Sequence, residues 1–184
     1  MGKLDGEKVA FLVANEGVEQ VELTEPWEAV IDAGGEPVLI APEVGKVQAF
    51  NHLDRADTFE ATLTPADANM ADYAGLVLPG GVANPDQLRT STEAVDFTRS
   101  FFKAGTPVAV ICHGPWTLVE AGVLTGRVVT SWPSLQTDIR NAGATWVDEE
   151  VRVCDHGLNL LISSRNPDDL PAFITQLIDS FAGG

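Results

Sequence analysis

The chain has 184 residues, two of them cysteine, and a formal net charge of −16 at pH 7. A chain of this length most simply forms one domain, here expected over residues 1–184, and buries about 70% of the surface that its unfolded form exposes. The negative charge repels phosphate backbones and anionic lipids, so we expect neither nucleic acid nor a membrane as a partner. Two cysteines make no disulfide framework, and no apolar stretch approaches the roughly 20 residues of a membrane span, so we expect a cytoplasmic protein.

Apolar runs alternate with amphipathic stretches from the start of the chain. Residues 8–14 predict a buried strand, residues 22–33 a helix and residues 37–41 a second strand. Residues 45–63 have the least regular pattern, which predicts short edge strands or an excursion. The apolar face of the first helix would consist of Leu23, Trp27, Val30 and Ile31.

The middle of the chain continues the alternation. Residues 74–78 predict a strand that ends in Pro79-Gly80-Gly81. Residues 92–103 predict a helix, because Gly105 follows as a stop signal. Residues 107–111 predict a buried strand, and a helical pattern over residues 116–121 begins a few residues later.

The last third predicts a strand at residues 127–130, a helix at 134–141 and three more strands at 145–147, 151–153 and 158–162. The final helix has the clearest signals, because Asn166 can cap it and Pro167 suits its first position. Its apolar stripe would consist of Leu170, Phe173, Ile174, Leu177, Ile178 and Phe181. The order of elements predicts a doubly wound α/β domain, in which ligands gather at the carboxyl ends of strands.

Cys112 lies at such a strand end, between the buried run at 107–111 and the following helix. A helix N-terminus offers unpaired N–H groups that favour an anion, and the thiolate is the reactive form of cysteine. We therefore expect a depressed pKa for Cys112, helped by the adjacent His113, and none for Cys154. The alternative is a small buried side chain that only packs.

A nucleophilic cysteine needs a charge partner and an oxyanion site. The His113 ring could form an ion pair with the thiolate if the turn brings both side chains to the same side. The Gly80-Gly81 turn could bring backbone N–H groups near a reacting carbonyl, although a tight strand exit needs the same glycines. Glu19 and Glu22 begin the first helix, and a carboxyl close to a thiolate would be pushed toward its protonated form.

Signals for cofactors are missing from the sequence. It contains no Gly-x-Gly-x-x-Gly, no Walker-type Gly-Lys-Ser/Thr run and no His-Glu-x-x-His, so we expect no cofactor. Cys154-Asp155-His156 could contribute metal ligands. A turn between two strands is the simpler interpretation, and we expect no metal.

Four segments follow one another along the chain: Glu19-Gln-Val-Glu-Leu23, Leu76-Val-Leu-Pro-Gly-Gly81, Ala109-Val-Ile-Cys-His-Gly-Pro115 and Ser163-Ser-Arg-Asn-Pro-Asp-Asp-Leu170. Together they resemble the PfpI-type intracellular protease family. That family belongs to the class I glutamine amidotransferase-like superfamily, which also contains the Parkinson-associated deglycases and glyoxalases. The resemblance runs from about residue 8 into the last helix.

The resemblance implies a flavodoxin-like fold, with a doubly wound, mostly parallel sheet and helices on both faces. It places Cys112 after a central strand, on a strained turn called a nucleophile elbow. It maps His113 onto the family's histidine and Glu22 onto the carboxyl that hydrogen-bonds the thiol. Gly81 and the His113 backbone match the oxyanion site, and Glu19 matches a second acidic position at the cleft.

Three places depart from the family pattern. The family's Gly-Lys-x-Gly stretch is Gly45-Lys46-Val47-Gln48 here and leads into Phe50-Asn-His-Leu53, so the choice of substrate could differ. PfpI-type proteases carry a glutamate just after the Gly-Gly turn that reaches the histidine of the neighbouring subunit, and the nearest match here is Asp86, one carbon shorter. An aromatic residue near the site, often tyrosine in the family, is Trp132 here. We expect a homodimer or higher homo-oligomer, in which Asp86 would complete a triad only across the interface.

The resemblance implies a stress-related cysteine hydrolase with Cys112 as nucleophile, first of all an intracellular cysteine peptidase, with a peptide or small carbonyl compound as substrate. A deglycase or glyoxalase reaction on methylglyoxal-type carbonyls is the alternative, because it needs only the thiol, a nearby carboxyl and a small pocket. Two further hypotheses are an oxidation sensor, since an exposed low-pKa thiol readily forms sulfinic acid, and a chaperone-like module with a vestigial pocket.

Overall fold

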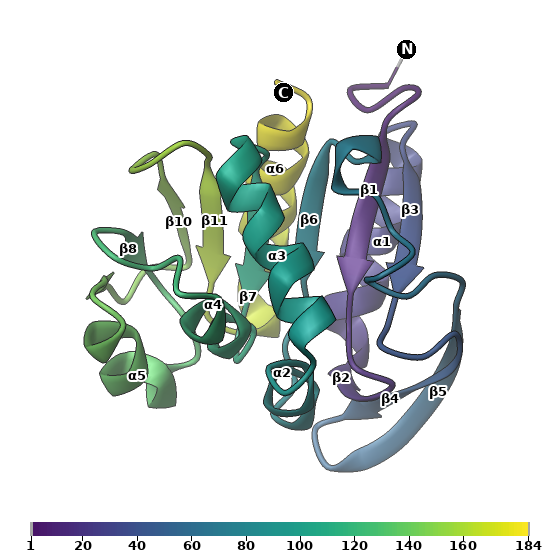
Figure 1. Cartoon of the computed structure of the whole chain (residues 1–184), viewed down its shortest axis with the longest axis horizontal. Coiled ribbons are helices and arrows are strands. Elements are labelled where there is room, and N and C mark those ends of the chain that lie inside the picture. Colours follow the sequence, from purple (N-terminus) through teal and green to yellow (C-terminus); the bar gives the residue numbers. More distant parts are fainter. Residues whose placement is uncertain (1, 184) are drawn as a thin grey trace.

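Six strands form the central sheet of the computed structural model, which describes residues 2–183 (Figure 1). Their order across the sheet is β10-β11-β7-β6-β1-β3, and only the β10–β11 pair among them is antiparallel. Numbered along the chain, the five parallel strands follow the order 2-1-3-4-5, which is the flavodoxin-like arrangement. The strands are β1 (Lys8–Leu12), β3 (Glu36–Ile40), β6 (Gly75–Leu78), β7 (Val108–Ile111), β10 (Val151–Cys154) and β11 (Leu161–Ser164).

Helices cover both faces of this sheet, which confirms the predicted architecture. Figure 1 shows α3 in front of the strands and α1 and α6 behind them, and each side has its own apolar core. The middle strands are buried on both faces, as expected for parallel strands between two helical layers. The helices are α1 (Gln20–Asp32), α2 (Ala83–Leu88), α3 (Thr92–Ala104), α4 (Pro115–Ala121), α5 (Gln136–Asn141) and α6 (Leu170–Phe181).

Helix ends follow the local signals in the sequence. The Ser91 hydroxyl accepts a hydrogen bond from the Ala94 N–H at the start of α3, and Gly105 ends this helix with φ of 80°. Asn166 caps a short 3₁₀ turn, Pro167–Asp169, that precedes α6, so the last α-helix begins later than predicted. The predicted face of α1 is wrong at one position, because Ile31 is 52% exposed.

The segment at 45–63 is more regular than its sequence suggests. Strands β4 (Gly45–Asn51) and β5 (Asp54–Ala61) form a long hairpin, which joins β2 (Glu16–Glu19) in a separate three-stranded sheet. The hairpin turns through His52 and Leu53, and His52 has a φ of 57°. Two-residue hairpin turns need positive φ and usually contain glycine or asparagine at the turn positions. His52 and Leu53 are neither, so the sequence pattern did not predict this turn. A small parallel pair, β8 (Val128–Val129) and β9 (Thr145–Trp146), stands beside the main sheet.

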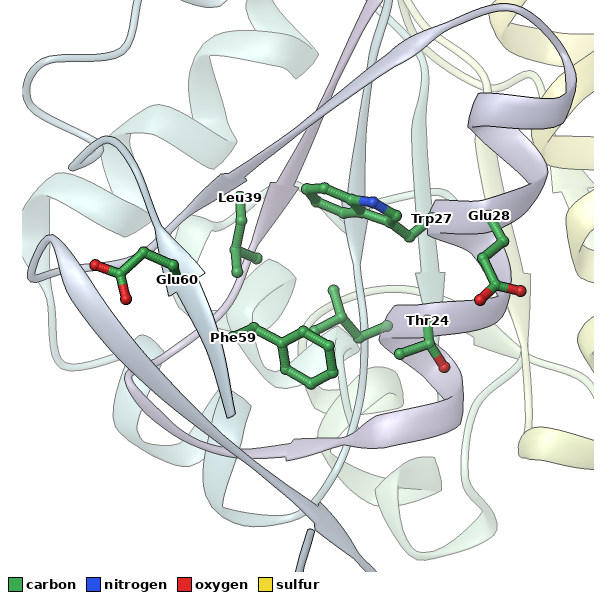
Figure 2. A pocket seen from close by; sticks show the side chains of 7 residues that line it. Thr24, Trp27, Glu28, Leu39, Phe59 and Glu60 are labelled. Carbon is green, nitrogen blue, oxygen red and sulfur yellow. The ribbon is translucent and has the colours of Figure 1, made fainter. Parts of the chain in front are cut away.

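An apolar cavity of about 240 Å³ lies between α1 and the strands β3 and β5 (Figure 2). Leu39 and Phe59 face the Trp27 indole across it, and the Trp27 ring packs at 5.1 Å from that of Phe11. No cysteine or histidine is among its described lining residues, so the chemistry predicted from the sequence must lie elsewhere. Within residues 2–183, no helix combines the length and hydrophobicity needed to cross a membrane.

Candidate active site

Cys112 occupies the sharp turn between β7 and α4, at the carboxyl end of a central strand. Its φ is 61°, which is rare for a residue with a side chain and typical of a strained functional turn. Two hydrogen bonds hold this conformation, because the Cys112 N–H donates to the Ser164 carbonyl at 3.1 Å and the Trp132 N–H donates to the Cys112 carbonyl at 2.9 Å. The turn has the form of the predicted nucleophile elbow.

Glycine at position 114 allows this turn to be tight. A Cβ there would lie 2.7 Å from Cγ2 of Val110 and 2.9 Å from the carbonyl oxygen of Ile111. Any side chain would therefore push α4 away from the strand. The close approach of α4 to β7 keeps the Cys112 sulfur at the carboxyl end of the strand.

Glu22, in the first turn of α1, lies directly against Cys112 and is fully buried. Its Oε2 accepts a hydrogen bond from the Gly80 N–H at 2.8 Å. A Cβ on Gly80 would lie 2.5 Å from that oxygen and 2.6 Å from Cβ of Cys112, so Gly80 leaves the space in which the two side chains meet. Oε1 is buried without a hydrogen-bond partner among residues 2–183, and the carboxyl group interacts with the Cys112 side chain.

Burial raises the pKa of Glu22 from its ordinary 4.5 to about 8. The Gly80 N–H opposes this effect, the negative charge of Glu19 adds to it, and the hydrogen bond to Cys112 opposes it again. The carboxyl is therefore largely protonated near pH 7, and it can donate a hydrogen bond to sulfur. A group whose pKa lies close to neutral pH can also both take and release a proton during a reaction.

The pKa of Cys112 departs from its ordinary value in the direction opposite to the prediction. The side chain is only 6% exposed, and burial raises the pKa of the thiol, as does the charge of an ionised Glu22. The backbone N–H groups of Gly81 and His113 lower it, but by less than burial raises it. Cys112 is therefore a thiol at rest, and its reactive form requires that a neighbour accept the proton.

His113 offers a ring nitrogen for that proton. Its Nδ1 lies 3.2 Å from the Cys112 sulfur, so the turn does bring both side chains to one side. The ring stacks on Trp132 at 5.5 Å and meets the edge of Trp116 at 5.3 Å. Burial lowers the pKa of His113 from 6.5 to about 4, so the contact near pH 7 is a hydrogen bond between neutral groups rather than the expected ion pair.

We expect His113 to stay neutral from pH 8 down to pH 5. Its ring ¹⁵N shifts should keep neutral-form values over this range, and signals lost in His113→Gln identify them. Since the unfolded chain binds this proton first, His113 should lower the free energy of unfolding as the pH falls from 6.5 toward 4. Protonation with a midpoint at or above pH 6 would show that the ring carries a charge beside sulfur.

The two glycines after β6 have different roles. The Gly80 N–H donates its hydrogen bond to Glu22. Gly80 was predicted to help bind an oxyanion, but its N–H is not available for that role. The N–H groups of Gly81 and His113 both approach the Cys112 sulfur, where an oxyanion on an attached carbon would form. Gly81 has a φ of 84°, and a Cβ there would lie 2.2 Å from the carbonyl oxygen of Gly17, so this position requires glycine.

A cavity of about 220 Å³ opens over Cys112. Glu19 lies in its wall at 9% exposure and accepts a hydrogen bond from the His52 N–H at 3.1 Å, so the β4–β5 turn forms part of the site. Sequence reasoning missed this contribution, and only the unusual Phe50-Asn-His-Leu run pointed to it. The cavity is lined by Glu19, Glu22, His52, Leu53, Gly81, Val82, Cys112, His113, Trp132 and Pro167.

Asp86 lies outside this cavity. It belongs to α2 and lines a neighbouring cavity of about 400 Å³ together with His52 and Trp116. Within the described part of the chain it makes no hydrogen bond to His113. One copy of the chain therefore brings Cys112, His113 and Glu22 together. Asp86, the fourth predicted catalytic residue, lies apart from them.

Cys154, the second cysteine, is structural. It is buried at the end of β10, and its sulfur accepts a hydrogen bond from the Val128 N–H at 3.3 Å. Among residues 2–183 no group of three or more histidine, cysteine, aspartate or glutamate side chains is arranged to hold a metal ion.

Comparison with known proteins identifies the family to which the sequence is similar. Residues 7–180 match the model of the DJ-1/PfpI family. General stress protein 18 of Bacillus subtilis is 41% identical over 91% of this chain and 94% of its own. Deglycase PH1704 of Pyrococcus horikoshii is 40% identical over 93% of this chain and 97% of its own.

A solved structure from Anabaena variabilis has the same fold. That protein contains a DJ-1/ThiJ/PfpI-like domain and a ferritin-like domain, and it superposes with a TM-score of 0.86 at 32% identity. The match covers 94% of this chain and 47% of that protein, so this chain spans about half of its length.

Proposed function

The chain belongs to the DJ-1/PfpI family, and we propose that it is a cysteine-dependent hydrolase acting on small carbonyl compounds and their adducts, as a deglycase or glyoxalase does. One observation carries this proposal. The Cys112 thiol lies between two backbone N–H donors and a carboxyl whose pKa is about 8, in a small cavity. Addition of a thiol to a carbonyl needs these groups and no others.

The first step adds sulfur to the aldehyde carbon of a 2-oxoaldehyde such as methylglyoxal. A C–S bond forms, the C=O π bond breaks, and the thiol proton passes to the neutral His113 ring or to the ionised fraction of Glu22. The N–H groups of Gly81 and His113 then transfer from sulfur to the new oxyanion. Loss of one such donor lowers turnover by about 10²- to 10³-fold in other enzymes.

The oxyanion then takes up the proton that left the thiol, which gives a hemithioacetal. In the second step Glu22, now ionised, takes the proton from the former aldehyde carbon and delivers it to the neighbouring carbon, while the hydroxyl proton moves to the neighbouring oxygen. The product is a thioester of a 2-hydroxy acid. Water then cleaves the C–S bond, which releases the acid and returns the proton to Cys112. Overall, methylglyoxal and one water give lactic acid, and an amine adduct of methylglyoxal gives lactic acid and the free amine.

The shape of the cavity favours a small substrate. Its volume is about 220 Å³, below the usual range of roughly 300–1,000 Å³ for small-molecule sites. Its rim carries exposed apolar side chains, Leu53 at 92%, Val82 at 57% and Trp132 at 39%. We propose that this rim receives the apolar part of an adduct while the carbonyl reaches Cys112.

Three parallel assays test this function. Purified protein is given methylglyoxal, a fluorogenic peptide or hydrogen peroxide, and lactate, fluorescence and cysteine sulfinic acid are measured, each beside Cys112→Ala. We expect lactate formation that depends on Cys112. Peptide cleavage or sulfinic acid formation without lactate would instead favour the peptidase or the oxidation sensor.

Peptide hydrolysis is the second candidate, and the position of Asp86 favours it. Asp86 lies beside Trp116, which contacts the His113 ring. We propose that a second copy of the chain in a homodimer or higher homo-oligomer could present its Asp86 to His113. A relative named general stress protein 18 is the support for a role in stress, and we propose a cytoplasmic location.

Asp86→Ala separates the two candidates. We expect less than a twofold change in lactate formation from methylglyoxal, because this reaction uses groups of one chain. Any peptide hydrolysis should fall by tenfold or more if the acid acts across an interface. Light scattering alongside an activity titration gives the oligomeric state, and a fully active monomer would exclude the intersubunit triad.

A further inference from the structure

Another cavity lies at the other end of the sheet from Cys112, and its walls carry several basic side chains. It measures about 430 Å³ and is formed by the ends of α3 and α4, the loop before β8 and the turn between β10 and β11. Arg99, Lys103, Arg127 and His156 line it. No aspartate or glutamate is among its described lining residues.

The cavity is remote from the nucleophile. Lys103 lies just before β7 and Cys112 just after it, so the length of the strand separates them. The β10–β11 turn lies at the same end as Lys103, because Cys154 pairs with Leu161 and Leu161 with Val108. In Figure 1 this turn and the end of α3 lie at one end of the strands, and the start of α4 lies at the other end.

Arg127 is the central observation. It is 4% exposed, and within residues 2–183 no carboxylate forms an ion pair with it. Its Nη1 donates to the Asn159 carbonyl at 2.9 Å, Nη2 donates to the Asn159 side chain, and the guanidinium lies 5.0 Å from the centre of the Phe102 ring. The Cys154 side chain is a further neighbour of the guanidinium. None of these partners is a carboxylate, whereas a buried cation is normally balanced by an anion.

Local contacts account for two of these charges but not for the third. Arg99 donates to the Ala121 carbonyl at the end of α4 and forms an ion pair with Asp96, and Lys103 lies in the last turn of α3, where cations stabilise the helix dipole. Arg127, however, belongs to no helix. The charge is also concentrated against the trend of the chain, since three of its eleven lysine and arginine side chains line this cavity while the net charge is −16.

Glycine at position 157 leaves room beside the guanidinium of Arg127. A Cβ at Gly157 would lie 2.9 Å from Nη2 of Arg127, so any other residue would cover the charged edge. Gly157 also has a φ of 93°, which side chains rarely adopt. Leu158, 76% exposed, and Phe102 add apolar surface beside the charges.

We propose that this cavity binds an anion of the phosphate class carried on a compact organic body. Guanidinium groups suit phosphate because they donate parallel hydrogen bonds, and an ammonium adds a mobile point charge. A phosphate fills only part of about 430 Å³, and the apolar wall can hold the rest of the ligand. The ligand would supply the anion that Arg127 lacks.

Calorimetric titration with inorganic pyrophosphate, inorganic phosphate, glycerol phosphate and AMP, at constant ionic strength, tests this site. We expect measurable binding of at least one organic phosphate, tighter than that of inorganic phosphate. Lys103→Gln should weaken binding by fivefold or more, and Lys103→Glu should abolish it. Lys103 is exposed, so both variants should fold.

Lys46→Gln is the matched control, because Lys46 is an exposed lysine on β4, outside the cavity. It should bind the probes as the parent does, as should Cys112→Ser, since the two sites are separate. Absence of binding for all four probes, or equal weakening by Lys46→Gln and Lys103→Gln, would overturn the proposal.

Discussion

Replacement of Cys112 by serine is expected to lower kcat/KM for methylglyoxal by at least about a thousandfold, a loss on the order of 4 kcal/mol in transition-state stabilisation. A serine hydroxyl keeps the size and hydrogen bonds of the thiol. It is far less acidic, and the neighbours of Cys112 are neutral near pH 7, because the pKa of Glu22 is about 8 and that of His113 about 4. No strong base is present to ionise an alcohol.

Cys154→Ala is the matched control for this prediction. Cys154 is the other cysteine and is also buried, but it contacts the β8 backbone rather than the cavity. Its replacement should change the unfolding temperature and leave kcat/KM within about twofold. If methylglyoxal turnover survived in Cys112→Ser but were lost in Cys154→Ala, the nucleophile would be Cys154 and its assignment to Cys112 would be wrong.

The second large effect concerns Glu22 and the pH dependence of stability. The folded protein keeps the Glu22 proton up to about pH 8, whereas an ordinary carboxyl loses it near 4.5. Between these values the folded state binds more protons than the unfolded state, so the free energy of unfolding falls as the pH rises. One pKa unit corresponds to about 1.4 kcal/mol, so the decline attributable to Glu22 across this whole range is on the order of 5 kcal/mol.

Glu22→Gln should remove this decline. Its amide can accept the Gly80 N–H through oxygen and donate to Cys112 through nitrogen, and it does not titrate. Denaturant unfolding at pH 5, 6, 7 and 8 measures the difference from the parent protein. Glu25→Gln, an exposed position on the same helix, is the control and should track the parent at every pH.

The same variant separates stability from catalysis. Glu22→Gln should reduce methylglyoxal turnover by about 10²- to 10⁴-fold, the range for loss of a general acid–base group, because an amide cannot carry a proton between carbons. Alkylation of Cys112 should largely persist, whereas Glu22→Leu should alter it. Parallel pH curves of the free energy of unfolding for Glu22→Gln and the parent would contradict the raised pKa.

Local sequence signals predicted the parts of the fold that local interactions determine. The Cys112 turn follows from a buried run, a glycine and a proline within a few residues, and α6 follows from its apolar stripe and the Asn166 cap. The His52 turn did not follow, because a residue with a side chain adopts positive φ there. Its conformation depends on Glu19, far away in the sequence.

The pKa values and charge pairing of the site could not be predicted from the sequence for a related reason. The predicted depression of the Cys112 pKa counted the helix terminus and His113, both local, and omitted burial, which depends on the whole fold. The commitment of the Gly80 N–H to Glu22 and the isolation of Arg127 from carboxylates likewise join segments distant in the chain. Both become visible only once the sheet brings their elements together.

Acid-quenched mass spectrometry during methylglyoxal turnover tests the central claim most directly, because a thioester on cysteine survives acid. The account predicts a covalent adduct with the mass of one methylglyoxal on the peptide that contains Cys112. The adduct should be absent from the Cys154 peptide and strongly reduced in Glu22→Gln, because Glu22 carries the proton that converts the hemithioacetal into the acid-stable thioester. Steady lactate formation with Cys112 unmodified throughout, or the same rate in Cys112→Ser, would contradict the account.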